Sequence, residues 1–291
     1  MIKTALLRLV ARLPLAWLHA AGSLAGRLIY RLSPSYAQRL QQNLRASDVW
    51  SDEVEYRRLL RASTREAGKG LLEIVKIWFD KPETVAALVA CKSWAVVEAA
   101  RAEGRGLIFL TPHLGCFEIS AFYGAQRLPL TVLYRPPRLR WLEPLMIAGR
   151  ERGQAKLAPA TLRGVRALYK ALLNGQAVGL LPDQAPAAGE GKWAPFFGRP
   201  AYTMTLVTRL QQATGAAIVL AFAERLPQGA GYELHLERVP TVAFDERALN
   251  RAVEALVRRR PEQYLWSYNR YKVPAGAREP PAQPATEGER Q

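Results

Sequence analysis

Short apolar runs alternate with helix-like stretches through the middle of the chain, and this alternation restricts the sequence to one class of fold. The runs with strand character are, in chain order, 106–111, 130–134, 177–183, 217–224 and 232–239. The stretches with helical character among them are 116–127, 162–173 and 203–214. Strands that alternate with helices predict an α/β fold, with a mixed sheet flanked by helices.

Composition supports a folded chain and indicates how it is divided. Apolar residues make up 49% of the 291 residues and charged residues 23%, a balance typical of a globular protein with a full core. We expect a separate helix over 1–34, one α/β domain over 35–274 and a disordered tail over 275–291, which is rich in Pro, Glu and Gln. Apolar residues at helical spacing predict that the domain begins with helical structure over 35–80.

The N-terminal segment is basic, and its uncharged stretch is shorter than a membrane-spanning helix. Seven Lys or Arg residues precede Asp48, the first acidic residue, and 14 uncharged residues separate Arg12 from Arg27. A helix that spans a bilayer needs about 20 apolar residues, so this stretch is short for a crossing. At 100° per residue the polar side chains fall within one arc of about 140°. They are Arg8, Arg12, His19, Ser23, Arg27 and Arg31.

Most apolar side chains of this segment lie outside that arc, namely Leu13, Trp17, Leu18, Ala21, Leu24, Leu28 and Leu32. A basic stripe beside a Trp/Leu face is typical of a helix that lies on an anionic bilayer. We therefore predict a membrane-associated protein, held on one face. The alternative is an ordinary helix that packs against the core. A cleaved signal peptide is disfavoured, because Pro14 and His19 interrupt its apolar region.

Charge and residue counts narrow the classes of partner and site. With 41 Lys and Arg against 25 Asp and Glu, the net charge of +16 favours an anionic partner, such as an acidic membrane or carrier protein. We expect no nucleic acid partner, because no known binding module is evident. Two cysteines, Cys91 and Cys116, exclude a disulfide scaffold and a four-cysteine zinc site. Three widely spaced histidines offer no pair of metal ligands, so we expect no metal.

Polar residues follow three of the expected strands, at the point where each strand ends. The segments are Thr111-Pro-His113, Tyr134-Arg135-Pro136 and Leu181-Pro-Asp183. In α/β sheets, ligands bind at the carboxyl ends of the strands. We therefore expect these segments to share one face of the protein. Nucleotide-binding glycine motifs and the G-x-S-x-G motif of serine hydrolases are absent.

His113 and Glu118 form the candidate catalytic pair. His113 ends an expected strand, Glu118 lies in the first turn of an expected helix, and Gly115 gives the turn between them its freedom. Imidazole has an unperturbed pKa near 6.5, so much of it is neutral at physiological pH. A carboxylate bonded to one ring nitrogen leaves the other able to take a proton from an attacking hydroxyl. The pair predicts general-base catalysis, although a structural histidine fits the same spacing.

The segment from His113 to Glu118 resembles the H-x4-D/E motif of the glycerolipid acyltransferase superfamily. More of the chain resembles one branch, the late acyltransferases of bacterial lipid A biosynthesis (the lauroyl/myristoyl transferase family). The matching pieces run in the family's order across residues 1–273. They are Asn43-Leu44, His113…Glu118, Tyr134-Arg135-Pro136, Gly149-Arg150, Leu162-Arg163-Gly164, Leu181-Pro-Asp-Gln184, Pro195-Phe-Phe-Gly198 and Pro261-Glu-Gln-Tyr-Leu-Trp266.

This resemblance implies a glycerol-3-phosphate acyltransferase-like fold, with the acyltransferase domain over 35–274. It implies transfer of a fatty acyl group from acyl carrier protein to a hydroxyl of a lipid A precursor, at the cytoplasmic face of the inner membrane. No cofactor is implied beyond the phosphopantetheine of the carrier that bears the acyl group. Nine basic residues between Arg135 and Lys170 would attract such an acidic carrier or a phosphorylated glycolipid.

The resemblance also assigns roles to single residues. His113 would be the base, and Glu118 would orient the imidazole and stabilise its charge. Arg135, Arg150 and Asp183 would bind substrate. Among these, Arg150 would face an acceptor phosphate or the developing oxyanion, since a guanidinium suits both. Asp183 would orient Arg150 or the surroundings of Glu118.

Three other functions stay open at this point. A lysophospholipid or other glycerolipid O-acyltransferase would use the same His/Glu chemistry. A thioesterase with Cys116 as nucleophile and His113 as base would lose activity on substitution of Cys116. A non-catalytic membrane adaptor would need only the basic helix, and would tolerate loss of His113 and Glu118.

Overall fold

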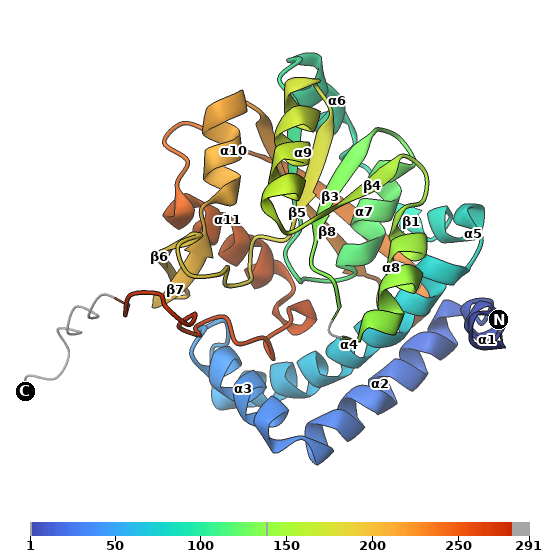
Figure 1. Ribbon diagram of the computed structural model, residues 1–291. Coiled ribbons are helices and arrows are strands. Elements are labelled where there is room, and N and C mark those ends of the chain that lie inside the picture. Colours follow the sequence, from blue (N-terminus) through green and yellow to red (C-terminus); the bar gives the residue numbers. More distant parts are fainter. Residues whose placement is uncertain (1, 138, 281–291) are drawn as a thin grey trace, which may run out of the picture.

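The protein is described by a computed structural model over residues 2–137 and 139–280, and a seven-stranded sheet forms its centre (Figure 1). The order of the strands is β1-β9-β8-β2-β5-β3-β4. They are β1 (Val89–Ala90), β2 (Leu107–Leu110), β3 (Leu130–Tyr134), β4 (Ala155–Pro159), β5 (Ala177–Leu180), β8 (Ala217–Arg225) and β9 (Tyr232–Val239). β8 and β9 pair antiparallel and the other neighbours pair parallel, so the predicted mixed sheet is confirmed.

Helices flank this sheet, and a small hairpin of β6 (Gly191–Phe196) and β7 (Arg199–Met204) lies apart from it. The helices are α1 (Ile2–Ala11), α2 (Leu15–Leu32), α3 (Pro34–Arg45), α4 (Glu53–Phe79), α5 (Pro82–Ala86), α6 (Ala95–Ala102), α7 (Phe117–Ala125), α8 (Glu143–Arg150), α9 (Leu162–Leu173), α10 (Leu206–Thr214) and α11 (Glu246–Arg259). Short 3₁₀ turns are η1 (Arg140–Leu142), η2 (Pro227–Gly229) and η3 (Pro261–Gln263).

The central strand β2 shows why the sheet is buried on both faces. Ile108 and Leu110 pack in one core cluster, together with residues of α9, α10 and α11. Leu107 and Phe109 pack in a second cluster, together with residues of α6 and α7. Successive strand side chains point to opposite faces, so a fully apolar run is what a strand between two helical layers requires.

The expected elements agree closely with the structure in the centre of the chain and less well at its ends. The strand expected over 130–134 and the helix expected over 162–173 have those bounds. The helix expected over 203–214 is wrong at its start, because Thr203 pairs with Lys192 in the hairpin and α10 begins at Leu206. The helical region expected over 35–80 is divided into α3 and α4, and Asp52 caps the second helix.

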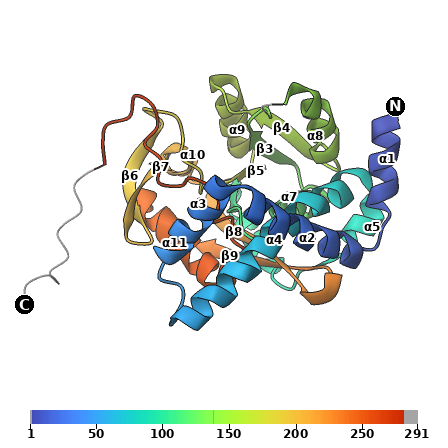
Figure 2. The ribbon, with the colours of Figure 1, turned by 90° about the horizontal axis from the view of Figure 1, so that it is seen from below.

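The N-terminal segment forms two helices rather than one, because the helix is interrupted before Pro14, which precedes the start of α2. α2 lies along α4 (Figure 2). Close approach of the two backbones depends on small residues, because a Cβ atom at Gly22 would lie 2.7 Å from the carbonyl oxygen of Gly68. His19, expected in the solvated polar stripe, is instead buried against α4, so that part of the prediction is wrong.

Large apolar side chains remain exposed on the rest of α2. Trp17, Leu24, Leu28 and Leu32 expose between 53% and 73% of their surface. One side of the helix therefore packs against the protein, as the alternative prediction had it, while its Trp/Leu face is open. Among the described residues, no helix is both long enough and apolar enough to cross a bilayer.

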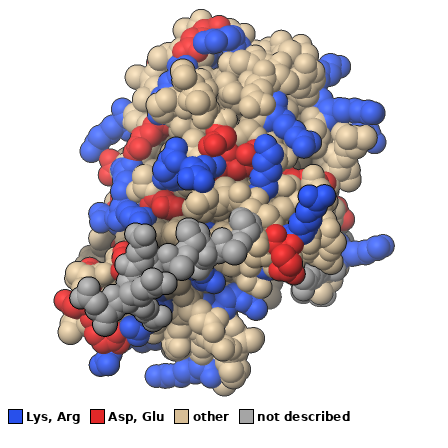
Figure 3. Space-filling model, turned by 90° about the vertical axis from the view of Figure 1, so that its left-hand side faces the viewer, with Lys and Arg blue, Asp and Glu red and all other residues tan. Residues whose placement is uncertain are grey.

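On the face of the molecule shown in Figure 3, Lys and Arg side chains, with fewer Asp and Glu, are scattered among uncharged residues. Most of the expected tail, residues 281–291, lies outside the described residues. The preceding residues run beside the hairpin, where the Trp193 indole Nε1–H donates to the Arg278 carbonyl at 3.0 Å.

Candidate active site

The carboxyl ends of β2, β5 and β3 lie at one edge of the sheet, because these strands are parallel neighbours. His113 follows β2 and Asp183 follows β5, and the structure brings these two side chains together. The expectation that the polar strand ends share one face is confirmed for them. Arg135 follows β3 at the same edge but is exposed, and among the described residues it has no hydrogen bond or ion pair with either side chain.

The His113 imidazole is bonded through both ring nitrogens. Its Nδ1 lies 2.8 Å from Asp183 Oδ1, and its Nε2 lies 3.1 Å from the amide Nε2 of Gln184. A carboxylate only accepts and an amide nitrogen only donates, so these partners assign the proton to Nδ1 and a lone pair to Nε2. This is the tautomer that a general base requires.

Asp183 is itself held in place by a second hydrogen bond and by burial. Its Oδ2 accepts the backbone N–H of His113 at 2.9 Å, and the side chain is buried. Burial raises the pKa of this carboxyl, whereas the charge and hydrogen bonds of His113 lower it, and the net pKa is below its usual value. Asp183 therefore stays ionised and is placed to stabilise an imidazolium ion.

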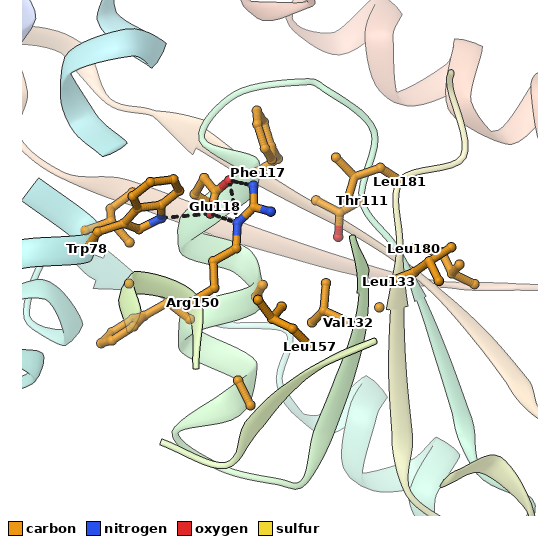
Figure 4. A pocket seen from close by; sticks show the side chains of 16 residues that line it. Trp78, Thr111, Phe117, Glu118, Val132, Leu133, Arg150, Leu157, Leu180 and Leu181 are labelled. Carbon is orange, nitrogen blue, oxygen red and sulfur yellow. Dashed lines mark hydrogen bonds and ion pairs between the residues drawn. The ribbon is translucent and has the colours of Figure 1, made fainter. Parts of the chain in front are cut away.

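Glu118 occupies the first turn of α7, as expected, but its partners differ from those expected. Arg150 Nε donates to the two carboxylate oxygens at 3.1 and 3.0 Å, Arg150 Nη2 donates to Oε1, and the Trp78 indole donates at 3.1 Å (Figure 4). The prediction that Glu118 orients the His113 imidazole is wrong, because Asp183 takes that place. Four residues, with the turn at Gly115, lie between the two, and Glu118 on α7 meets Trp78 of α4 and Arg150 of α8.

Local packing explains how Arg150 reaches this carboxylate. Gly149 lies against the Trp78 ring, and a Cβ atom there would collide with the indole. The absence of a side chain lets α8 pack closely on α4, and Arg150 then lies over the same indole, 5.5 Å from its centroid. The Arg150 side chain is 26% exposed, so it is partly accessible from outside.

An apolar pocket, part of it open to solvent, adjoins this ion pair. Much of its apolar lining comes from β3, β4, β5 and the residue after β5, namely Val132, Leu133, Leu157, Leu180 and Leu181 (Figure 4). Phe122 of α7 also lines it. Phe117 also lines the pocket, and its ring lies 4.9 Å from that of His113. The pocket has the chemistry to hold a hydrocarbon chain with one end near the base.

The turn that carries His113 is anchored by distant parts of the chain. Gly115 has φ of +59°, and its N–H donates to the Gln263 carbonyl at 3.1 Å. A Cβ atom at Gly115 would collide with the Ala223 carbonyl, which accepts the N–H of Cys116 at 2.9 Å. The His113 carbonyl accepts the N–H of Leu265 at 3.0 Å. This contact of Gln263 was not predicted from the sequence. The signal that could have indicated it is the place of Gln263 in the segment 261–266, one of the pieces that resemble the family.

Cys116 lies within this turn but is poorly suited to act as a nucleophile. It is a free thiol, fully buried, and burial raises its pKa well above the usual value. A thiol that stays protonated is unreactive, since the thiolate is the nucleophile. The environment of Cys116 therefore argues against the thioesterase alternative.

The fold and the site define a class of protein: an α/β enzyme with a carboxylate-supported histidine beside an apolar pocket. Residues 1–273 match the family of bacterial lipid A biosynthesis acyltransferases, and the chain belongs to that family. The resemblance found in the sequence is thereby confirmed. The protein is an acyltransferase, and the adaptor alternative is not supported.

Curated relatives agree with this family. The chain is 26% identical over 275 residues to the lipid A biosynthesis lauroyltransferase of Escherichia coli K12. The matched region covers 91% of this chain and 88% of the relative. It is 27% identical to the palmitoleoyltransferase of the same organism, over 75% and 73% of the two chains. It is 24% identical to the myristoyltransferase of that organism, over 83% and 76%.

Proposed function

We propose that this acyltransferase moves a fatty acyl group from acyl carrier protein to a hydroxyl of a lipid A precursor, with His113 as general base. The observation that carries the proposal is the lone pair of His113 Nε2, set by Asp183 on the opposite nitrogen and placed beside an apolar pocket. An acyl chain in that pocket would bring its thioester close to the imidazole.

The reaction follows from this geometry. The acceptor hydroxyl replaces the Gln184 amide at Nε2 and gives its proton to the imidazole, while its oxygen attacks the thioester carbonyl carbon. The tetrahedral intermediate then breaks its carbon–sulfur bond, and the departing thiolate takes the proton back from Nε2. Asp183 stabilises the imidazolium that exists between these two steps. The enzyme therefore ends the cycle in its starting protonation state.

In this proposal Glu118 and Arg150 act as a unit. The guanidinium, oriented by Glu118 and partly exposed, is suited to an acceptor phosphate or to the oxyanion of the intermediate. Glu118 would then be a positioning residue that acts through Arg150 instead of through the imidazole. Arg135, exposed at the same edge of the sheet, is proposed as a contact for the acceptor headgroup.

We also propose that the protein works at the cytoplasmic face of the inner membrane. The exposed Trp/Leu face of α2 supplies an apolar surface, and the excess of basic residues favours an anionic bilayer. The same charge supports association with an acidic carrier protein.

One assay tests the function. Purified protein is given acyl carrier protein loaded with fatty acids of different length, together with either a lipid A precursor or a lysophospholipid, and products are measured by mass spectrometry. We expect acylation of the lipid A precursor from the carrier-bound donor. Acylation of the lysophospholipid alone would favour the glycerolipid alternative, and transfer from acyl-coenzyme A but not from the carrier would refute the proposed donor.

A further inference from the structure

A buried group of charged side chains lies behind the turn that carries His113, and the catalytic mechanism does not use it. Glu73 of α4 accepts from Arg225 at the end of β8, with Nε at 2.9 and 3.1 Å and Nη2 at 2.6 Å. Tyr232 of β9 donates its hydroxyl to Glu73 at 3.1 Å, and His19 of α2 lies 3.4 Å from the same carboxylate. All four side chains are buried.

The pair is charged in spite of its burial. Burial raises the pKa of Glu73, whereas Arg225 and His19 lower it, to a net value of about 2. Removing two charges from water is costly, and a well-packed apolar pair at such a place is often at least as stable. Stability alone therefore gives little reason for an ion pair at this position.

One further contact of Arg225 points to a different role. Its Nη2 also donates to the carbonyl oxygen of Gly115 at 2.7 Å. Gly115 lies two residues after His113 and three before Glu118, so the guanidinium bonds the middle of the catalytic segment. Gln263 joins the same arrangement, because its side chain accepts the backbone N–H of Arg225 at 2.9 Å and its carbonyl accepts from Gly115.

The neighbouring helix supports the same segment at a second point. Glu73 and Trp78 both belong to α4, and Trp78 donates directly to Glu118. α4 thus contacts one end of the segment through Trp78, and its centre through Glu73 and Arg225. An arginine suits this task, because its planar fork can donate to a carboxylate and to a carbonyl at once.

We propose that Arg225, held by Glu73, is a positioning residue that fixes the turn at Gly115 and thereby sets where the His113 imidazole meets the acceptor hydroxyl. This inference deepens the proposed function and rests on it. Arg225 touches no reacting atom. It acts on the rate of the chemical step, and only weakly on substrate binding, because Gly115 and Arg225 do not line the pocket.

The test separates positioning from simple stabilisation. The double variant Glu73→Leu/Arg225→Met replaces the ion pair with apolar side chains. Glu66, which lies 3.6 Å from the Arg225 guanidinium, keeps its ion pair with Lys69 in this variant. We expect its melting temperature to stay within a few degrees of wild type, while kcat for acyl transfer falls roughly tenfold or more and KM changes less than about threefold. A matched control, Lys76→Met/Asp80→Asn, removes another buried ion pair of α4 that does not touch the turn, and should keep kcat.

A second variant covers the case in which the double variant does not fold. Arg225→Lys keeps the positive charge beside Glu73 but replaces the planar fork with one ammonium group, so we expect an intermediate loss of kcat with little change in stability. A folded double variant, or Arg225→Lys, with wild-type kcat would overturn the proposal.

A spectroscopic readout is independent of turnover. The Nδ1 proton of His113, hydrogen-bonded to Asp183, is followed by NMR on protein labelled with ¹⁵N-histidine. We expect this signal to shift or broaden in the Arg225 variants and to stay unchanged in the Lys76/Asp80 control. Unchanged His113 signals in the Arg225 variants would overturn the positioning role. Wild-type protein with an intact signal but no acyl transfer would instead count against the proposed function.

Discussion

The two ends of the segment from His113 to Glu118 are built differently. At the His113 end, a buried carboxylate from a neighbouring strand end holds the ring through one nitrogen and the backbone of the same residue through its other oxygen. At the Glu118 end, the carboxylate is the buried partner, and it holds an arginine that is partly exposed. The first arrangement orients His113 as a base, and the second leaves the positive charge of Arg150 partly exposed. Each of the two acid–base residues of the motif thus has its own partner outside the motif, Asp183 for His113 and Arg150 for Glu118.

The strongest test of this comparison is removal of the base. His113→Ala should lower kcat by roughly two to four orders of magnitude, because positioned general-base catalysis contributes about that much. Acyl transfer from carrier-bound donor to lipid A precursor is the measurement. His235→Ala is the matched control, since that histidine lies on β9 and pairs with Glu224. Comparable loss in both variants would point to general destabilisation.

Asp183→Asn should have the next largest effect, roughly a hundredfold loss of kcat, because the imidazolium loses its stabilising charge. Single-turnover measurements isolate the chemical step. Asp245→Asn, at the cap of α11, controls for the substitution itself. A larger loss in the chemical step for Glu118→Gln than for Asp183→Asn would contradict this, because it would show that Glu118 and not Asp183 supports the base.

Glu118→Gln should cost less, about tenfold in kcat/KM, because it loosens Arg150 without touching the base. Arg150→Met should cost at least as much. The double variant should be little worse than Arg150→Met alone, since two residues that act as a unit are not additive. Strictly additive losses in this double-mutant cycle would show that the two side chains act independently.

The smallest effect is expected at Cys116, which lies between the two ends. Cys116→Ser should leave kcat within roughly threefold of wild type, because a buried and protonated thiol takes no part in the chemistry. Modification of the folded protein by iodoacetamide should likewise be slow at this position. Loss of activity comparable to that of His113→Ala would revive the thiol mechanism.

Local patterns predicted the strands and their polar ends, but not the pairing of side chains between them. The apolar runs define β2, β3 and β5, and parallel pairing then gathers their carboxyl ends at one edge. Asp183 lies seventy residues from His113, whereas Glu118 lies only five away. Proximity along the chain therefore favoured the wrong carboxylate, because the correct one depends on the neighbouring strand.

Elements with weak or mixed patterns were missed for a similar reason. β6 and β7 carry Pro195 and Pro200, which are unusual in strands and are tolerated here in an isolated two-stranded hairpin. His19 belongs to the polar arc of its own helix, yet it is buried, because it pairs with the carboxylate of Glu73 on α4. When the partner of a residue is distant along the chain, the neighbouring sequence does not indicate the pairing.

The anchoring of the Gly115 turn by η3 has a consequence for biosynthesis. Gln263 and Leu265 contribute two of the hydrogen bonds that shape the turn, and they are made about 150 residues after it. A nascent chain that has already formed its parallel strands still lacks this support until the final segment leaves the ribosome. Premature termination shortly before residue 261 would therefore release a chain that has all seven strands of the sheet but lacks two of the hydrogen bonds that fix the turn of His113.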